Sequence, residues 1–303
     1  MIKDLLAITD LSAEGIGELL HDAIEIKARL KRGEDYRPLS GKTLLLIFQK
    51  PSCRTRVSFQ VGMYQLGGHA VYLSPDDIQL GKRELVSDVA RTLSRYGDGI
   101  MARLFGHETI LELAKYATVP VINGLTDLLH PCQVLADLQT VLEWRKSLEG
   151  TRIAFVGDGN NVANSWLKAA ARIPLDLRMA TPPGYEPDED ILQEAREAGV
   201  STIRLTNDPG DAVQEAEVIY ADVWASMGQE AEAEKRMRDF QGFQVDQALV
   251  DRADREVKVM HCLPAHRGQE ISDEVIEGPH SVVFDQAENR MHIQKAILVK
   301  LMG

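Results

Sequence analysis

The feature that most constrains the fold is a repeated alternation of short apolar runs with longer stretches of helical periodicity. Thr43–Phe48 is the first such run, and residues 152–156 form another deep in the second half of the chain. Runs of this length, apolar at successive positions, are typical of strands buried on both faces of a parallel sheet. Because parallel strands are usually joined by a crossover helix, the alternation predicts an α/β fold.

The length of the chain and the spacing of these runs predict two domains. The 303 residues exceed an average domain of roughly 100 to 200 residues. We expect each domain to be a mostly parallel sheet flanked by helices, with residues 1–134 in the first and 135–289 in the second. A terminal helix from about residue 290 to 303 is expected to pack back on the first domain. The expected strands are 43–48, 70–73, 99–102 and 119–122 in the first domain, and 152–156, 176–180, 202–205, 218–221 and 257–261 in the second.

Charge and cysteine content exclude several classes of protein. The chain has 46 acidic and 34 basic residues, a net charge of -12, which disfavours binding to nucleic acid or to an anionic membrane. No stretch approaches the roughly 20 apolar residues that span a bilayer, and the first residues lack a leader pattern. We therefore predict a cytoplasmic protein. Cys53, Cys132 and Cys262 lie far apart without a metal-binding spacing, so we expect free thiols and no metal.

Residues 50–56, with the sequence KPSCRTR, follow the first buried strand and open a helical run. A helix amino terminus presents unpaired N–H groups to anions, and arginine donates forked hydrogen bonds to phosphate. The segment thus suits a phosphate site. Taken alone, it is equally compatible with a helix cap followed by exposed arginines.

Ser52-Cys53-Arg54-Thr55-Arg56 resembles the Ser-Thr-Arg-Thr-Arg signature of the aspartate and ornithine carbamoyltransferase family. Cys53 replaces the usual threonine, and Gln60 stands where the family usually has a glutamate. Other segments extend the resemblance over nearly the whole chain: His130-Pro131-Cys132-Gln133, Arg103 after a strand, Gln79-Leu80-Gly81, and Arg290 near the end. The resemblance implies that carbamoyl phosphate binds to Ser52, Cys53, Arg54, Thr55, Arg56, Gln79, Arg103, His130, Gln133, Cys262, Leu263 and Arg290.

The same resemblance implies which groups take part in the reaction. Thr55, Arg103, His130 and Cys262 are the expected catalytic residues. Negative charge grows on the carbamoyl oxygen when its carbon is attacked, and positioned donors would stabilise that oxyanion. Gln79 corresponds to a family residue that reaches into the site of a neighbouring subunit, which implies a homotrimer with sites at the subunit interfaces.

In the second half, Gly157-Asp158-Gly159-Asn160-Asn161 follows a predicted strand. A dinucleotide fingerprint is disfavoured, because Val162 occupies the place of the third glycine and no ribose-binding acid follows the next strand. A nicotinamide-dependent oxidoreductase is therefore the weaker alternative. The resemblance places Asn161 on the amino-acid end of ornithine, and a structural tight turn stays open as the plainer interpretation.

The segment from Asp222 to Gly228 contains Ser-Met-Gly, which distinguishes the ornithine branch of the family from the aspartate branch. On this resemblance Asp222 accepts hydrogen bonds from an ammonium group, while Ser226 and Met227 meet the carboxylate and α-amino group of ornithine. An isolated aspartate after a strand is otherwise most often a helix cap.

His261-Cys262-Leu263-Pro264 follows the last predicted strand and matches the family's His-Cys-Leu-Pro, whose cysteine lies beside the reacting amine. The adjacent Cys and His raise the alternative of a cysteine protease. We disfavour it, because neighbouring residues on a strand point to opposite faces of the sheet.

The resemblance implies transfer of the carbamoyl group of carbamoyl phosphate to the δ-amine of L-ornithine, giving L-citrulline and phosphate in arginine metabolism. No cofactor is required. Putrescine, N-acetylornithine and aspartate are the alternative acceptors. A non-catalytic anion-binding protein is the alternative from another class, suggested only by Cys53 and Gln60.

Overall fold

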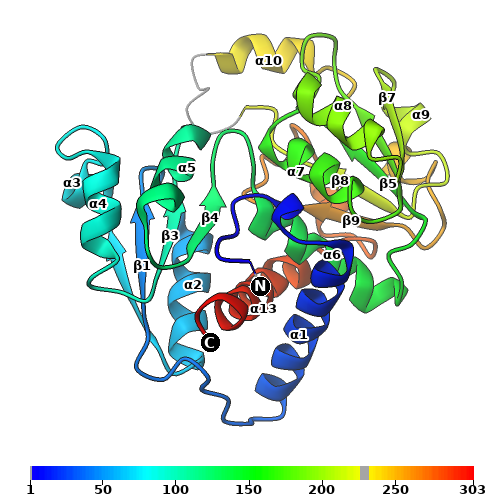
Figure 1. Cartoon of the computed structure of the whole chain (residues 1–303). Coiled ribbons are helices and arrows are strands. Elements are labelled where there is room, and N and C mark those ends of the chain that lie inside the picture. Colours follow the sequence, from blue (N-terminus) through cyan, green and yellow to red (C-terminus); the bar gives the residue numbers. More distant parts are fainter. Residues whose placement is uncertain (1, 226–231) are drawn as a thin grey trace. The chain divides into compact units, whose positions relative to one another are not determined.

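The computed structural model describes residues 2–225 and 232–303, which divide into two compact units (Figure 1). The first unit comprises Met1–Gln139 and Glu288–Gly303, and the second comprises Thr140–Ala287. The two divisions fall within α6 (Pro131–Arg145) and α13 (Val283–Met302), so each of these helices contributes to both units. No helix within these described ranges is long and apolar enough to cross a membrane.

The first unit contains a four-stranded parallel sheet with the strand order β2-β1-β3-β4. Its strands are β1 (Thr43–Phe48), β2 (His69–Leu73), β3 (Gly99–Arg103) and β4 (Val121–Leu125). Its other elements are η1 (Ile8–Asp10), α1 (Ala13–Lys31), α2 (Cys53–Gln65), α3 (Pro75–Ile78), α4 (Val86–Leu93) and α5 (His107–Tyr116).

The alternation of side chains along β1 explains how this sheet is covered. Leu45 and Ile47 point to one face, where they form a core with Ile100 of β3 and with residues of α4 and α5 such as Val89 and Leu113. Helices α4 and α5 lie together on that side in Figure 1. Because both faces are covered, β1 is apolar at successive positions, which is the pattern that predicted it.

The second unit contains a five-stranded parallel sheet with the strand order β7-β6-β5-β8-β9. Its strands are β5 (Thr151–Val156), β6 (Leu175–Ala180), β7 (Thr202–Thr206), β8 (Val218–Ala221) and β9 (Lys258–His261). The helices are α7 (Asn161–Ala170), α8 (Glu189–Glu197), α9 (Pro209–Ala212), α10 (Ala233–Asp239), α11 (Gln247–Val250) and α12 (Asp273–Ile276).

The two faces of the second sheet bury different aromatic groups. On one face the Tyr220 ring stacks on Phe155 at 5.6 Å and meets Trp166 of α7 edge-on at 5.8 Å. On the other face, Val156 and Ile219 belong to a core that contains Phe240. Offset and edge-on aromatic pairs of this kind fix the orientation of the elements that carry them.

The predicted fold class is confirmed, with two mostly parallel sheets flanked by helices. Two expected elements differ from the structure by more than one residue. The strand expected at 119–122 is β4 at Val121–Leu125, because Pro120 has no N–H to donate and only its carbonyl accepts, from Ile100. The terminal helix expected from about residue 290 already begins at Val283, because its polar first turns hid the helical pattern.

Candidate active site

The predicted anion-binding residues of the first unit come from the carboxyl ends of its strands. Ser52 follows β1, Arg103 is the last residue of β3, and His130 follows β4. In a parallel sheet these ends share one edge, where ligands of α/β proteins usually bind. The sheet order therefore brings together residues that are far apart in sequence.

At the amino terminus of α2 three side chains are linked by hydrogen bonds. Ser52 caps the helix, its Oγ accepting from the Thr55 backbone N–H at 3.2 Å and donating to Thr55 Oγ1 at 3.1 Å. Buried Thr55 also accepts a hydrogen bond from Arg290 Nη2 of α13 at 2.9 Å. The structure thus brings Ser52, Thr55 and Arg290 to one place.

His130 lies among the cationic groups of the same unit. Its side chain is buried, and its pKa lies well below the ordinary value of 6.5, first because of burial and then because of the charges of Arg290, Arg103 and Arg54. The imidazole is consequently neutral beside three guanidiniums. A group of positive charges like this attracts an anion, and a neutral imidazole N–H is an uncharged donor to it.

Gln133 and its partner lie one turn apart on α6. Gln133 Nε2 donates to Asp137 Oδ1 at 2.8 Å, and both side chains are buried. This hydrogen bond fixes which end of the amide is the donor, so Oε1 is the acceptor end of the Gln133 side chain.

Three of the predicted anion-binding residues lie at the surface of the first unit instead. Arg56 is exposed, its guanidinium lying 3.8 Å from the Tyr72 ring centre while Nε donates to Gln60 Oε1 at 3.3 Å. Gln60 therefore still orients an arginine, through an amide oxygen rather than a carboxylate. Cys53 is exposed as the first residue of α2. Gln79 is exposed after α3 in a left-handed conformation, with φ +41°.

Lys50 was not among the predicted site residues, although it lies close to them in the sequence. It is buried at the end of β1, where its ammonium pairs with Asp127 and lies 4.6 Å from the Phe105 ring centre. The signal available in the sequence was a lysine directly after a buried strand and before the signature.

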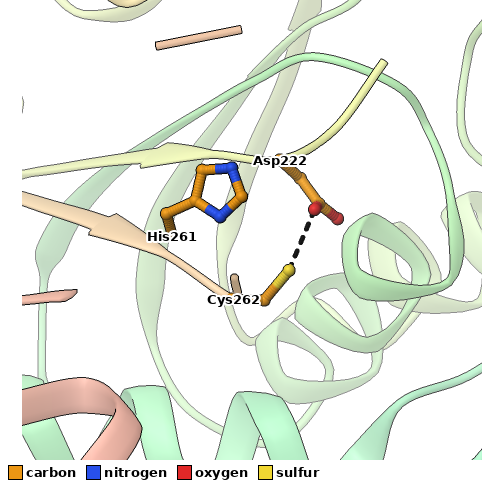
Figure 2. A group of neighbouring side chains, drawn as sticks. All are labelled: Asp222, His261 and Cys262. Atoms are coloured by element: carbon orange, nitrogen blue, oxygen red, sulfur yellow. Dashed lines mark hydrogen bonds between the residues drawn. The ribbon is translucent and has the colours of Figure 1, made fainter. Parts of the chain in front are cut away.

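In the second unit, Asp222 is the centre of a hydrogen-bonded group at the ends of β8 and β9. Its carboxylate is buried and accepts from Asn160 Nδ2 at 2.8 Å and from Cys262 Sγ at 2.9 Å. Figure 2 shows the Asp222 carboxylate, the Cys262 thiol and the His261 ring turned toward one another. Donors of this kind offset the loss of solvation of a buried carboxylate.

The expectation that His261 and Cys262 point to opposite faces was wrong. Donor atoms of Asp222, His261 and Cys262 all lie within 4.8 Å of one another. The physical reason is that β9 ends at His261 and the backbone then turns, with Leu263 in a left-handed conformation at φ +58°, so the alternation of a strand does not extend to Cys262.

His261 is fully engaged by groups other than a nucleophile. Its Nδ1 accepts from the Leu263 backbone N–H at 2.8 Å, so Nε2 carries the proton and donates to buried Glu270 at 3.1 Å. Although the three donor atoms are close enough to suit a transition-metal ion, both ring nitrogens are occupied in this way. The arrangement is therefore a hydrogen-bonded support for the turn at Leu263 rather than a Cys–His catalytic pair.

The turn after β5 contains two asparagines, which differ in their position relative to α7. Asn160 caps α7, with its Oδ1 accepting from Val162 at 2.9 Å and its Nδ2 donating to Asp222. Asn161, the predicted ornithine ligand, is the first residue of the helix. Gly159 is required here, because a Cβ would lie 2.3 Å from the backbone of Glu186. The contact of Asn160 with Asp222 was not predicted.

Two predicted ornithine ligands, Ser226 and Met227, lie outside the described residues. The stretch before them is described as far as Ala225, and the chain is described again from Glu232. Of the predicted amino-acid ligands, the structure therefore places Asn161 and Asp222.

Both halves of the chain match models of one protein family. Residues 3–143 match the aspartate/ornithine carbamoyltransferase carbamoyl-P binding domain, and residues 149–301 match the Asp/Orn binding domain of the same family. The chain is 55% identical over 304 residues to ornithine carbamoyltransferase of Anoxybacillus flavithermus, covering 99% of this chain and 96% of that protein.

Two relatives from Pyrococcus furiosus agree with these matches. The anabolic ornithine carbamoyltransferase of that organism is 54% identical over 305 residues, which cover 99% of this chain and 96% of the relative. The solved structure of ornithine carbamoyltransferase from P. furiosus superposes with a TM-score of 0.95 at 54% identity, covering 100% of this chain and 97% of that one.

Proposed function

We propose that the chain, which belongs to the aspartate/ornithine carbamoyltransferase family, transfers the carbamoyl group of carbamoyl phosphate to the δ-amine of L-ornithine. The products are L-citrulline and phosphate. The relatives from A. flavithermus and P. furiosus are named ornithine carbamoyltransferases, and the anabolic name of one supports a role in arginine biosynthesis.

The observation that carries the proposal is the group of cations formed by Arg54, Arg103 and Arg290 around His130. Arg290 donates to Thr55, and the charges of Arg54, Arg103 and Arg290 all act on neutral His130. A phosphate at this place meets a helix amino terminus together with charge-assisted donors. We infer that the first unit binds carbamoyl phosphate, with Ser52, Cys53 and Arg56 contributing from the start of α2.

The group around Asp222 supports binding of the amino acid by the second unit. A buried carboxylate that accepts from Asn160 and Cys262 is a suitable acceptor for an ammonium group. We propose that Asn161, Ser226 and Met227 meet the amino-acid end of ornithine. The Cys262 and Leu263 backbone carbonyls accept from substrate nitrogens.

In the proposed mechanism carbamoyl phosphate binds first and ornithine second. The lone pair of the neutral δ-amine attacks the carbamoyl carbon, and Thr55, Arg103 and His130 donate to the oxyanion that forms. The C–O bond to phosphate then breaks, phosphate leaves with the electron pair, and the amine proton passes to it. Gln133 holds the carbamoyl amide, and no metal or organic cofactor takes part in this scheme.

We further propose that the active form is a homotrimer. The left-handed backbone of exposed Gln79, unusual for a residue with a side chain, suits a loop that is fixed by a neighbouring subunit. The location in the cytoplasm stays a prediction of the sequence.

The test is product formation from carbamoyl phosphate with ornithine, putrescine, N-acetylornithine and aspartate offered in parallel. Arg54→Ala serves as the blank, because it removes one of the proposed phosphate donors without touching the acceptor site. We expect citrulline with ornithine alone and a loss of at least about a hundredfold in the blank. Carbamoylation of another acceptor, or equal rates for both proteins, would refute the proposal.

A further inference from the structure

We propose that Glu270 is a positioning residue for the acceptor site of the second unit, because it holds the turn at residues 262–263 through the ring of His261. The inference rests on the proposed function, in which Asp222 binds an ammonium group and the backbone carbonyls of this turn accept from substrate nitrogens. Glu270 lies in the loop between β9 and α12 and was not among the predicted site residues.

The backbone of Leu263 needs a restraint from its surroundings. Its φ of +58° lies in the left-handed region, which a residue with a branched side chain disfavours. Such a conformation persists only where neighbouring groups hold it. His261 is one of these groups, since its Nδ1 accepts from the Leu263 backbone N–H at 2.8 Å. The orientation of the His261 ring is therefore tied to the shape of the turn.

Glu270 holds that ring at its other nitrogen. Its Oε1 accepts from His261 Nε2 at 3.1 Å, and both side chains are 0% exposed. A buried Nε2–H without an acceptor is costly, and a carboxylate can only accept. The contact therefore selects the tautomer in which Nε2 carries the proton and Nδ1 is free to accept from Leu263.

Both partners of this contact are themselves fixed. Glu270 Oε1 also accepts from the His266 backbone N–H, and the Glu270 carbonyl accepts from the Val245 N–H at 2.8 Å. The backbone of His261 is held by Gln286, whose Oε1 accepts from the His261 N–H at 2.9 Å. The carboxylate thus lies at a defined place relative to the ring.

The same turn brings the Cys262 thiol to the proposed ammonium acceptor. Cys262 Sγ donates to Asp222 Oδ1 at 2.9 Å, and Figure 2 shows both groups together with the His261 ring. A buried carboxylate that loses a donor is less well solvated and takes up a different position. Glu270 therefore acts on Asp222 indirectly, through His261 and the turn.

The first experiment compares Glu270→Met, which removes the acceptor, with Glu270→Gln, whose amide oxygen can still accept from His261. In Glu270→Met we expect KM for ornithine to rise about tenfold or more, while binding of inorganic phosphate, a ligand of the first unit, stays within about twofold of the parent. In Glu270→Gln the rise in KM should be less than about threefold.

His266→Ala is the matched control. It removes an exposed ring and keeps the backbone N–H from which Glu270 accepts, so its KM for ornithine should match that of the parent. A residue with a purely structural role would lower the free energy of unfolding and leave KM for ornithine unchanged. A folded Glu270→Met protein with the KM of the parent, or a Glu270→Gln protein that loses as much as Glu270→Met, would overturn the inference.

His261→Asn keeps the inference testable if Glu270→Met does not fold. The amide oxygen of asparagine can accept from the Leu263 N–H in place of Nδ1, but the side chain is too short to reach Glu270. We expect KM for ornithine to rise about tenfold, and by no more than about a further twofold when Glu270→Met is added. Parent-like KM in His261→Asn, or losses that multiply in the double variant, would contradict the proposed route.

A measurement without substrate separates this inference from the proposed function. Nitrogen NMR of protein with isotope-labelled histidines reports which imidazole nitrogen carries the proton, and His261→Asn assigns the signal among the 8 histidines. We expect His261 to be protonated at Nε2 in the parent and in Glu270→Gln, and to leave this single form in Glu270→Met. If the parent makes no citrulline, the proposed function fails. An unchanged His261 signal in Glu270→Met would instead refute the positioning role itself.

Discussion

The burial of His130 determines the protonation state in which its side chain can take part in the reaction. Because its pKa lies well below 6.5, through burial and through the charges of Arg290, Arg103 and Arg54, the imidazole is neutral at pH 7. A neutral ring still carries one N–H group that can donate to an oxyanion. Its ionisation should therefore leave no trace in the pH dependence of the rate.

We predict that kcat/KM for ornithine rises with pH toward the ionisation of the δ-amine, near the ordinary amine pKa of about 10.4, with no step near 6.5. His130→Asn should lower kcat by about 100-fold, the loss that follows removal of one oxyanion donor, and leave the shape of the profile unchanged. Initial rates measured at about ten pH values between roughly 6 and 9.5 test this prediction. A step near pH 6.5 that disappears in His130→Asn would show that a titrating histidine sets the rate.

How well residues could be predicted depended on how far away their partners are in the sequence. Arg103 and His130 were predicted from the short family motifs that contain them, and the structure places Arg103 at the end of β3 and His130 after β4. The contacts of Asp158 and Trp224 with Arg236 join segments that no local pattern relates. Cys262 was predicted as a site residue but with the wrong orientation, because the turn at Leu263 follows from φ rather than from residue type.

Helix α13 carries buried ionisable groups within the first unit. Burial lowers the pKa of Lys295 to about 8 and, together with the charge of Lys295, lowers that of His292 to about 4. Lys27 of α1 donates to Asn289 of the same helix at 2.8 Å. Polar groups of this kind fix how α1 and α13 pack. Burial also disfavours the protonated forms of Lys295 and His292.

The dependence of folding stability on pH follows from the difference between the folded and unfolded pKa of each group. For His292 the folded value of about 4 lies below 6.5, so its contribution is present above pH 6.5 and lost as the pH falls from 6.5 toward 4. For Lys295 the folded pKa of about 8 lies below the ordinary value of 10.5, so stability is lost as the pH falls from 10.5 toward 8. At pH 7 the buried ammonium therefore opposes folding.

We predict that Lys295→Met raises the free energy of unfolding at pH 7 by about 1 to 3 kcal/mol, because it removes a buried charge and keeps the apolar stem. Urea denaturation measures the effect. Lys300→Met, at a more exposed position of the same helix, should change stability by less than about 0.5 kcal/mol. A Lys295→Met protein that is less stable than the parent would mean that the ammonium has a stabilising partner.

Buried strands and long helices could be predicted from the sequence, and helices of about one turn could not. The strands β1 and β5 are continuous apolar runs, and α1 begins where Ser12 caps it, its Oγ accepting from Gly15 at 3.0 Å. Helices of four residues, such as α9 and α12, are too short to show a period. The polar sequence of α10 hid it in the same way as the first turns of α13.

For the whole molecule, the proposed trimer makes a prediction that no single subunit can satisfy. Gln79→Ala and Arg54→Ala subunits should each be weakly active. Mixed trimers, formed by mild dissociation and reassembly, should regain activity, because some sites then combine an intact Gln79 from one subunit with an intact Arg54 from its neighbour. Citrulline formation before and after mixing measures the effect.

The matched control mixes Arg54→Ala with Arg103→Ala. Both residues belong to the cationic group of one subunit, so no mixed trimer contains an intact site from this pair. Recovery in the control, or none in the Gln79 mixture, would show that Gln79 does not act on a neighbouring site.

The two-unit architecture was the most predictable property of the molecule. Each sheet is built from local strand–helix units whose apolar runs are visible in the sequence, whereas the order of strands within a sheet depends on pairing between distant residues. The functional assignment depended on ordered motifs from Ser52 to Arg290, and its acceptor depended on a segment around Ser226 that lies outside the described residues.

The central claim is that the first unit binds carbamoyl phosphate through Arg54 and its neighbours, while Asp222 of the second unit binds the acceptor. Equilibrium binding of carbamoyl phosphate to the parent, Arg54→Ala and Asp222→Asn proteins tests it most directly. The account predicts binding weakened by about 10- to 150-fold in Arg54→Ala and within about twofold of the parent in Asp222→Asn. Parent-like binding by Arg54→Ala, or an equal loss in Asp222→Asn, would contradict it.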